Sequence, residues 1–299
     1  MQEIGRLLTA MVTPMDDEGK VDYAQARRLA QALVESGSHG VVISGTTGEA
    51  PTLSDEEKVR LVREVKEALG QRGTVVAGTG TYNTAHSIEL SREAQKAGAD
   101  ALLLVVPYYN RPSQEGLYEH FRAIAQAVDI PCILYNIPGR TALNMTAETT
   151  IRLSHVDNII GVKEASGDLV QISRILAEAR QGFLVWSGDD ALTLPIMAVG
   201  GYGVIAVTSH LVGGKMRAMM EAYLEGRVEE ARRLHLQLLP LMQALMTVAP
   251  NPCPIKWALN HVGFRVGRPR LPLVEPDPQG QERLRREIAR IQLDLKVPV

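Results

Sequence analysis

Residues 158–168 read NIIGVKEASGD. Within this stretch, a short β-branched apolar run ends at a lysine, Lys163. A run of this kind is typical of a buried parallel strand. We therefore expect Lys163 to lie at the end of the strand in a place that is partly shielded from water. Desolvation there favours the neutral, nucleophilic form of a lysine amine. The chain has eight lysines against 24 arginines, and the other seven lysines lie in polar helical, loop or terminal contexts. From position alone, a lysine that extends to water or pairs with Glu164 is an equally good interpretation.

Similar apolar runs recur along the chain, with amphipathic helical stretches between them. This alternation is the pattern of repeated β-α units around a parallel sheet. Eight such units within about 220 residues fit a (β/α)8 TIM barrel better than an open doubly wound sheet, so we expect an α/β fold of this class. The predicted strands are Leu7–Val12, Gly40–Ser44, Thr74–Ala77, Ala101–Val106, Cys132–Tyr135, Ile159–Lys163, Phe183–Trp186 and Gly203–Val207.

Helix signals between the runs support this interpretation. Ser54 and Glu57 have the spacing of a capping box, and Gly70 ends the same helix. Toward the C-terminus the strand pattern stops and helical periodicity continues alone. We therefore expect a catalytic barrel domain over residues 1–225 and a small C-terminal helical domain over residues 226–299. The last helices are expected at Lys215–Leu224, Val228–Thr247, Pro254–His261 and Gln281–Leu295, with the longest loop at Gly267–Gly280.

Composition and charge exclude several classes of protein. The 299 residues carry a formal net charge of −2 without a basic block, which argues against a nucleic-acid partner. The sequence shows no apolar run of membrane-spanning length and no signal-peptide pattern, so we expect no membrane partner and a cytoplasmic location. Cys132 and Cys253 lie far apart with no metal-ligand spacing around them, and we expect both to be reduced thiols.

The residues after each predicted strand are the candidates for chemistry, because catalytic groups of a barrel collect at the C-terminal ends of its strands. They include an amine, phenols, hydroxyls and a guanidinium, which together can bind a 2-oxo acid, form an imine and move protons. Residues 45–48 form either a plain turn or an anion cradle. Asp189 and Asp190 could suggest a metal, but without a nearby histidine or third carboxylate a helix N-cap fits better. The candidate segments are Ser44–Glu49, Pro107–Pro112, Tyr135–Thr141, Lys163 and Ser187–Asp190.

Six motifs, in this order, resemble the family of dihydrodipicolinate synthases, also called 4-hydroxy-tetrahydrodipicolinate synthases. The likeness covers essentially the whole chain and places it near N-acetylneuraminate lyase, among class I aldolases that form an imine between a barrel lysine and a 2-oxo acid. The resemblance implies a lyase without cofactor or metal that condenses pyruvate with aspartate 4-semialdehyde in lysine and diaminopimelate biosynthesis. The motifs are GTTGE at 45–49, PYYNRP at 107–112, YNIPGRT at 135–141, GVKEA at 161–165, SGDD at 187–190 and PCPIK at 252–256.

The resemblance also implies catalytic roles for individual residues. Lys163 would form the Schiff base with pyruvate. Tyr135, Thr46 and Tyr109 would form a proton relay, with Tyr109 reaching in from a neighbouring subunit. A tyrosine that one subunit contributes to the site of another requires at least a dimer. The family suggests a homotetramer built as a dimer of dimers.

The same resemblance implies the substrate contacts. Thr47, with backbone N–H groups of its turn, would hold the pyruvate carboxylate, and Arg140 would take the carboxylate of aspartate 4-semialdehyde. Gly188 and the backbone at Ile205 would line the far side of the cavity. The product would be 4-hydroxy-tetrahydrodipicolinate.

Relatives that are inhibited by lysine bind it in an allosteric pocket at the dimer interface, through a serine, two histidines, an asparagine, a glutamate and a tyrosine. The matching positions differ in this chain except for the tyrosine, although Asp55 could compensate in part for the lost glutamate. We therefore expect no appreciable inhibition by lysine. The matching positions are Ala50, Asp55, Lys58, Tyr82, His86 and the retained Tyr108.

Two departures from the family pattern lie away from the imine. Residues 205–210 read IAVTSH where the family often has a serine-valine segment followed by asparagine, and Cys253 stands where isoleucine is usual.

Two other functions fit part of the pattern. A sugar-acid aldolase or sialic-acid-type lyase would use the same imine, but those relatives need hydroxyl-binding groups where this chain has Arg140, whose guanidinium suits a carboxylate. A barrel that binds an oxo acid without turnover would leave the joint presence of Lys163 and its proton-relay partners unexplained.

Overall fold

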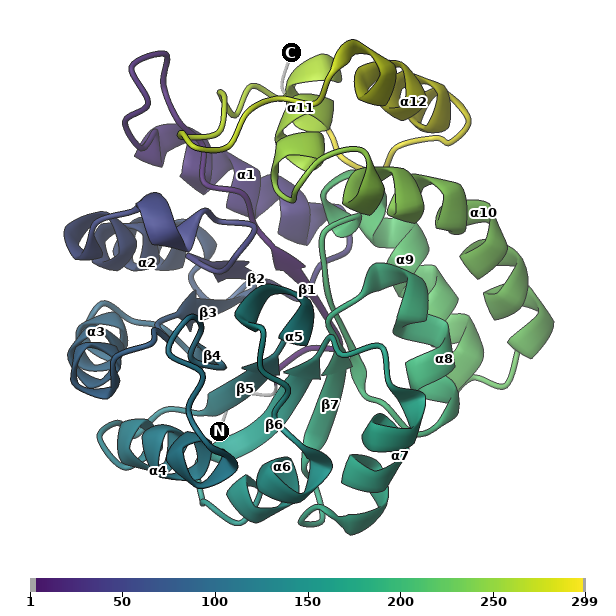
Figure 1. Cartoon of the computed structure of the whole chain (residues 1–299). Helices are drawn as coiled ribbons and strands as arrows, with labels where there is room; N and C mark the ends of the chain where they lie inside the picture. Colours follow the sequence, from purple (N-terminus) through teal and green to yellow (C-terminus); the bar gives the residue numbers. More distant parts are fainter. Residues whose placement is uncertain (1–3, 298–299) are drawn as a thin grey trace.

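A closed barrel of eight parallel strands forms the centre of the molecule (Figure 1). The computed structural model describes residues 4–297. Each strand pairs with its neighbours in sequence, and β1 closes the barrel against β8. The predicted (β/α)8 fold is therefore confirmed. The strands are β1 Leu7–Ala10, β2 Gly40–Ile43, β3 Thr74–Gly78, β4 Ala101–Val105, β5 Cys132–Asn136, β6 Ile159–Glu164, β7 Leu184–Ser187 and β8 Gly203–Ala206.

The strand bounds differ from the predicted ones by one or two residues. β1 ends at Ala10 rather than Val12, and β7 is shifted by one residue, starting at Leu184 rather than Phe183. Apolar residues continue past the last paired residue because the loops at the strand ends are also buried. Hydrophobicity therefore marks the centre of a strand better than its ends.

Helices surround the barrel and carry the expected caps. In α2 the Ser54 hydroxyl accepts from the Glu57 N–H at 3.2 Å, and the Glu57 carboxylate accepts from the Ser54 N–H at 2.9 Å, so the predicted capping box is confirmed. The outer helices are α1 Tyr23–Glu35, α2 Asp55–Leu69, α3 Thr84–Lys96, α4 Gln114–Ala125, α6 Ala147–Leu153, α7 Leu169–Glu178, α8 Thr193–Ala198 and α9 Ser209–Leu224. Short turns precede three of them: η1 Ala50–Thr52, α5 Pro138–Thr141 and η2 Asp190–Leu192.

Apolar side chains form two separate layers. The larger layer lies between the strands and the helices, and the smaller one fills the inside of the barrel. Leu8, Val42, Ile133 and Trp186 belong to the inner layer and are almost fully buried. The barrel is thus packed rather than hollow.

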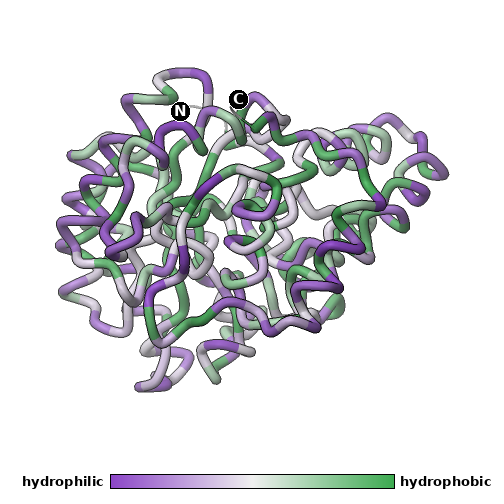
Figure 2. The backbone as a smooth tube through the Cα atoms, turned by 90° about the horizontal axis from the view of Figure 1, so that it is seen from above, coloured by the Kyte–Doolittle hydropathy of each residue, from purple (hydrophilic) through white to green (hydrophobic). Residues whose placement is uncertain are grey.

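The last helices are α10 Val228–Thr247, α11 Cys253–His261 and α12 Pro278–Ala289, which lie beside α9 and α1 (Figure 1). Seen from above, a helical extension projects from the rounded barrel (Figure 2). The prediction for α12 was wrong at both ends, since a helix over Gln281–Leu295 was expected. Leu295 is buried without being helical, because Asp294 and Leu295 both donate backbone N–H groups to the Leu211 carbonyl.

Cys132 and Cys253 are both free and buried, and burial raises the pKa of the Cys132 thiol to about 12.

No helix within residues 4–297 is both long and apolar enough to cross a membrane.

Candidate active site

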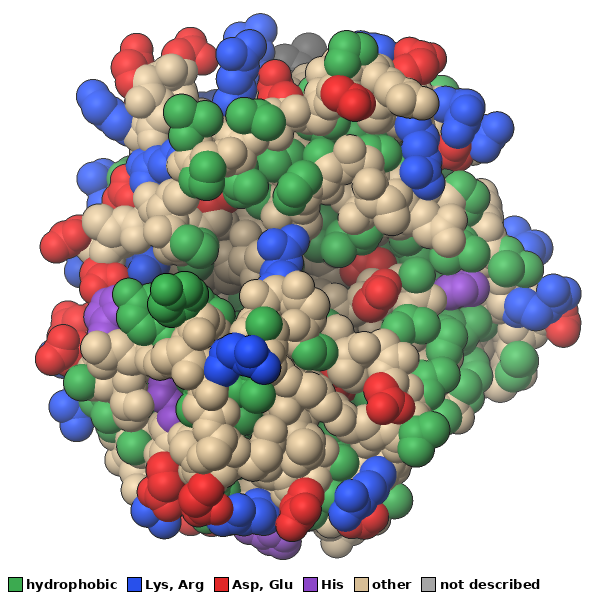
Figure 3. Space-filling view, in the orientation of Figure 1, with side chains coloured by type: hydrophobic (Ala, Val, Ile, Leu, Met, Phe, Trp, Pro, Cys, Tyr) green, Lys and Arg blue, Asp and Glu red, His purple; other side chains and the backbone are tan. Residues whose placement is uncertain are grey.

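A cavity of about 250 Å³ opens at the C-terminal mouth of the barrel. It is visible as the hollow in the face shown in Figure 3, with a cationic side chain at its edge. Segments after β2, β3, β4 and β5 supply its walls. Its polar lining includes Ser44, Thr46, Tyr108, Tyr135, Arg140 and Thr141. The convergence expected from the strand ends is therefore present on this side of the barrel.

Lys163 lies beside Tyr135 inside the barrel mouth. The two residues are paired across the β5–β6 ladder, so both side chains point to the same face. The Lys163 Nζ lies 4.3 Å from the centre of the Tyr135 ring, and the residue is 6% exposed. Within residues 4–297 its amine makes no hydrogen bond or ion pair. An amine held in a dry place without a carboxylate partner is suited to attack a carbonyl.

Glu164 does not pair with Lys163, so that interpretation of the strand end was wrong. Neighbouring residues of a strand face opposite sides, and Glu164 therefore points toward the helices. Its carboxylate accepts from the Asn136 amide at 3.1 Å, the Ser166 N–H at 2.7 Å and the Gln171 amide at 3.2 Å. Burial raises the pKa of Glu164 against the opposing effect of these hydrogen bonds.

The turn after β2 brings two hydroxyls to the site. The Glu49 N–H donates to the Thr46 carbonyl at 3.1 Å, and Glu49 itself has a left-handed backbone with φ of 58°. Gly48 has no room for a side chain, since a Cβ there would lie 2.9 Å from the Ser44 nitrogen. Thr46 lines the cavity, and the buried Thr47 hydroxyl accepts from the Asn251 amide at 2.9 Å.

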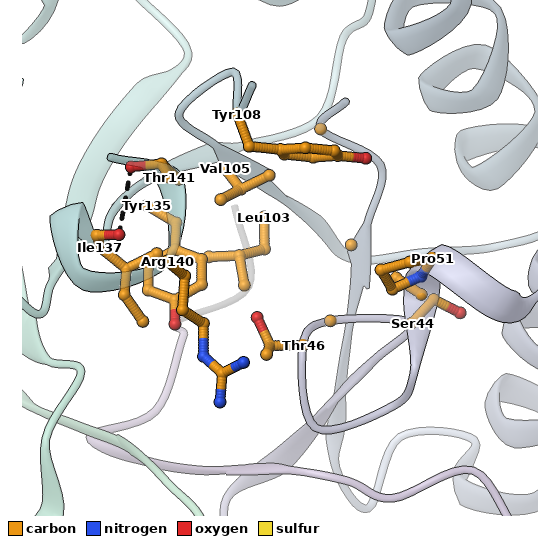
Figure 4. Close-up of a pocket in the computed structure, with 14 residues that line it drawn as sticks. Ser44, Thr46, Pro51, Leu103, Val105, Tyr108, Tyr135, Ile137, Arg140 and Thr141 are labelled. Carbon is orange, nitrogen blue, oxygen red and sulfur yellow. Dashed lines mark hydrogen bonds between the residues drawn. The ribbon is translucent and has the colours of Figure 1, made fainter. Parts of the chain in front are cut away.

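Arg140 extends over the cavity from the short helix α5. Figure 4 shows its guanidinium lying close to the side chains of Thr46 and Tyr135 on one side of the pocket. The guanidinium donates to the Asn251 carbonyl at 3.3 Å. Arg140 is exposed and has no carboxylate partner within residues 4–297, so its charge is free to bind an anionic substrate.

Sequence reasoning missed two residues that support this site from the C-terminal segment. Asn251 contacts both Thr47 and Arg140. Lys256 is 0% exposed and forms an ion pair of 2.7 Å with Glu49. The expectation that every lysine except Lys163 lies in a polar context was therefore wrong for Lys256. The local signals were that this lysine ends the PCPIK motif and stands between Ile255 and Trp257, in a stretch whose other residues from Cys253 to Leu259 are apolar.

The tyrosines after β4 point in two directions. Tyr108 lines the cavity and packs edge-on against Tyr82, with ring centres 5.3 Å apart. Tyr109 is 94% exposed, and its backbone has a φ of 72°. A left-handed tyrosine is uncommon, and the ring is exposed together with that of Tyr82, so two aromatic side chains lie at the surface here. Tyr109 does not line the cavity of its own chain.

Gly188 follows β7 and Ile205 lies in β8, two strands that supply none of the cavity walls. A Cβ at Gly188 would lie 2.7 Å from the Ala165 Cβ, so only glycine fits against the end of β6. Ile205 is buried in the inner layer together with Tyr135 and Trp186. Neither residue belongs to the walls of the cavity as the structure has it.

The two aspartates after β7 differ in role. Asp189 accepts from the Ala191 N–H at 2.9 Å and so caps the η2 turn, as expected. Asp190, in contrast, is buried and accepts from the backbone N–H groups of Val207 and Thr208, which ties the end of β8 to this loop. Among residues 4–297, no three His, Cys, Asp or Glu side chains are grouped so that they could hold a metal ion.

The positions that match the allosteric pocket of lysine-inhibited relatives contact one another in two groups. Ala50 and Tyr108 line the active-site cavity. Asp55 instead accepts from His86 at 2.6 Å and from Lys58 at 3.2 Å. Burial alone would raise the pKa of Asp55, but these two partners outweigh it, and the pKa lies below its usual value.

Known proteins of one family resemble this chain over nearly its whole length. The model of the dihydrodipicolinate synthetase family matches residues 3–291. The 4-hydroxy-tetrahydrodipicolinate synthase of Moorella thermoacetica is 58% identical over 280 residues, which is 94% of this chain and 96% of that protein.

Two solved structures agree with this likeness. The dihydrodipicolinate synthase DapA-2 of Bacillus anthracis has a TM-score of 0.95 at 43% identity and is matched over 98% of this chain and 100% of its own. The enzyme of Cyanidioschyzon merolae, solved with lysine bound, has a TM-score of 0.94 at 46% identity, over 96% of this chain and 98% of its own.

Proposed function

The chain belongs to the dihydrodipicolinate synthetase family, and from this premise we propose that it condenses pyruvate with aspartate 4-semialdehyde through a Schiff base on Lys163. The product is 4-hydroxy-tetrahydrodipicolinate, an intermediate on the route to lysine and diaminopimelate. The observation that carries the proposal is the buried amine of Lys163, free of hydrogen bonds within residues 4–297 and placed against Tyr135 at the cavity.

The proposed chemistry begins with the amine of Lys163 attacking the C2 carbonyl of pyruvate, and loss of one water leaves an imine. Loss of a methyl proton converts the imine into an enamine, which forms a carbon–carbon bond to the aldehyde of the second substrate. The amino group of that substrate then attacks the imine carbon. Ring closure releases the lysine amine, so the enzyme returns to its starting state.

We assign the proton transfers to Tyr135, Thr46 and Tyr109. The Lys163 Nζ lies 4.3 Å from the centre of the Tyr135 ring, and this closeness supports the assignment of Tyr135, because a proton donor must lie near the reacting nitrogen. Thr46 shares the cavity wall with Tyr135. Tyr109 would complete the relay from a neighbouring subunit.

We assign the pyruvate carboxylate to Thr47 and the N–H groups of its turn, and the carboxylate of the semialdehyde to Arg140. Gly188 and the backbone at Ile205 are proposed to line the far side of the cavity. A guanidinium over the cavity that has no carboxylate partner within residues 4–297 supports the assignment of Arg140, since planar bidentate pairing with a carboxylate is its strongest interaction.

A coupled assay tests the reaction. The chain should turn over pyruvate with aspartate 4-semialdehyde and should show far weaker activity on N-acetylneuraminate or 2-keto-3-deoxygluconate. Activity on only the latter compounds would favour a sugar-acid aldolase or lyase, and no turnover of any of them would favour an oxo-acid-binding barrel.

Arg140→Ala should act mainly through the second substrate. Losing the guanidinium removes the proposed partner of the semialdehyde carboxylate, so kcat/KM for the semialdehyde should fall by about 10-fold or more, given the strength of a charge-assisted pair. Pyruvate trapping on Lys163 should stay close to wild type. Unchanged semialdehyde kinetics together with impaired use of pyruvate would contradict the assignment of Arg140.

We propose that the active form is a homo-oligomer, a tetramer built from two dimers, in which Tyr109 enters the site of its partner. Its exposure and left-handed backbone support this placement. Mixing inactive Lys163→Ala with inactive Tyr109→Phe subunits should therefore restore activity, because each hybrid dimer contains one intact site. Random exchange should make about one quarter of the sites active. No recovery, in a mixture shown by native mass spectrometry to have exchanged subunits, would place Tyr109 in its own site.

Free lysine should neither bind nor inhibit at millimolar concentration. The Asp55 carboxylate that would have to replace a glutamate is already engaged by His86 and Lys58, and the cation of Lys58 would repel a positively charged ligand. Calorimetric titration with lysine should give no saturable heat, while pyruvate titrated into the same sample serves as the positive control. Submillimolar saturable binding with partial inhibition would refute this expectation.

Two further assignments stay proposals. We propose a cytoplasmic location, which the two free buried thiols support, because reduced cysteines are usual in that compartment. We also propose the division into a barrel domain over residues 1–225 and a helical domain over residues 226–299, although both ranges extend beyond the described residues.

A further inference from the structure

The buried ion pair of Lys256 and Glu49 lies directly behind the turn that carries Thr46 and Thr47. The Lys256 Nζ donates to Glu49 at 2.7 Å, to the Thr13 carbonyl at 3.0 Å and to the Arg268 carbonyl at 3.0 Å. These contacts use all three donors of the ammonium group. Both side chains of the pair are completely buried.

The pair joins segments that are distant in the sequence. Thr13 follows β1, Glu49 ends the turn after β2, and Lys256 belongs to α11. The second oxygen of Glu49 accepts from the Arg270 N–H at 2.8 Å, so the carboxylate is held from two sides. The Thr13 hydroxyl also donates to the Gly48 carbonyl at 2.7 Å, which fastens the turn itself.

We propose that Lys256 is a positioning residue for the reaction, which through Glu49 holds residues 45–49 in the shape that presents Thr46 to the cavity and keeps Thr47 against Asn251. This inference rests on the proposed function. Lys256 does not line the cavity, so it acts only through the turn. A turn with two glycines in five residues has little stiffness of its own. The left-handed backbone of Glu49 must therefore be stabilised by contacts from outside the turn.

Stability alone is a weak explanation for the pair. Desolvation of two charges offsets much of their attraction, and apolar residues of similar volume often stabilise such a position as well or better. A buried pair with all its hydrogen bonds satisfied does, however, specify one geometry. That property is what a turn that must place the hydroxyls of Thr46 and Thr47 requires.

The test compares Lys256→Met, Glu49→Gln, the double variant and Lys215→Met with the wild type. Lys215 forms an ion pair of 2.6 Å with Asp294, which also ties the C-terminal segment to the barrel but does not touch the turn. Each protein is measured for Tm, for the KM of pyruvate, for kcat and for borohydride trapping of pyruvate on Lys163.

Each single variant at the pair should lower Tm and raise the pyruvate KM, with kcat/KM falling on the order of 10²-fold, as expected for misplaced substrate-binding groups. The double variant should regain most of the Tm, because no uncompensated charge stays buried, yet it should keep the kinetic defect. Lys215→Met should lower Tm without changing the KM.

Recovery of the kinetics together with Tm in the double variant would overturn the positioning role, and so would an equal rise of the pyruvate KM in Lys215→Met. If the single variants fold poorly, the kinetics and Tm of the double variant alone test the positioning role. Failure of the wild type to trap pyruvate and to turn it over would instead overturn the proposed function, and this inference with it.

Discussion

Replacement of Lys163 by alanine is expected to abolish turnover and covalent trapping of pyruvate together. Borohydride reduces the imine to a stable secondary amine, so the wild type should gain one pyruvate-derived adduct per chain, and peptide mapping should place it on Lys163. The alanine variant has no amine at this position and should gain none. Its Tm should stay near that of the wild type, because the Lys163 amine makes no hydrogen bond or ion pair within residues 4–297.

Lys256 provides an internal control for this result. Both lysines are buried, but the Lys256 ammonium donates to three oxygens and is paired with Glu49, whereas the Lys163 Nζ lies over the Tyr135 ring. A nucleophile must have a free lone pair, so the adduct should form only on Lys163. An adduct on Lys256 or on any other lysine would show that the nucleophile was wrongly assigned.

Tyr135→Phe and Thr46→Val should each lower kcat by about 10²–10⁴-fold, the effect expected when a proton-transfer group is lost. The phenylalanine ring keeps the packing of the inner layer, so the loss reports the hydroxyl rather than the fold. Stopped-flow or coupled kinetics at saturating substrates would measure it. Pyruvate should still be trapped on Lys163 in both variants, though more slowly.

Tyr118→Phe is the matched control, because Tyr118 lies on α4, where its ring stacks with Arg152 at 4.2 Å from the guanidinium. Removing this hydroxyl should leave kcat within a few-fold of wild type. If Tyr135→Phe lost no more activity than Tyr118→Phe, the proposed relay would have to be abandoned.

The sequence alone was sufficient for the fold and for part of the site. Alternating apolar runs and capped helices are local patterns, and eight β-α units close into a barrel by a general rule of topology. That rule also places the polar residues after different strands at one mouth, which is why Tyr135, Thr46 and Arg140 could be nominated together. The family was predicted from five motifs at these strand ends and from PCPIK at 252–256, and the comparisons confirmed it.

Only the tertiary structure decided which buried charges meet. Glu164 is next to Lys163 in the chain, yet it faces the helices, whereas Glu49 pairs with Lys256 across more than two hundred residues. Asn251 likewise reaches Thr47 and Arg140 from the C-terminal segment. Periodicity and capping describe interactions within a few residues, so they determine elements and their faces. Contacts between distant segments depend on how those elements pack, and no local pattern around Lys256 specifies its partner.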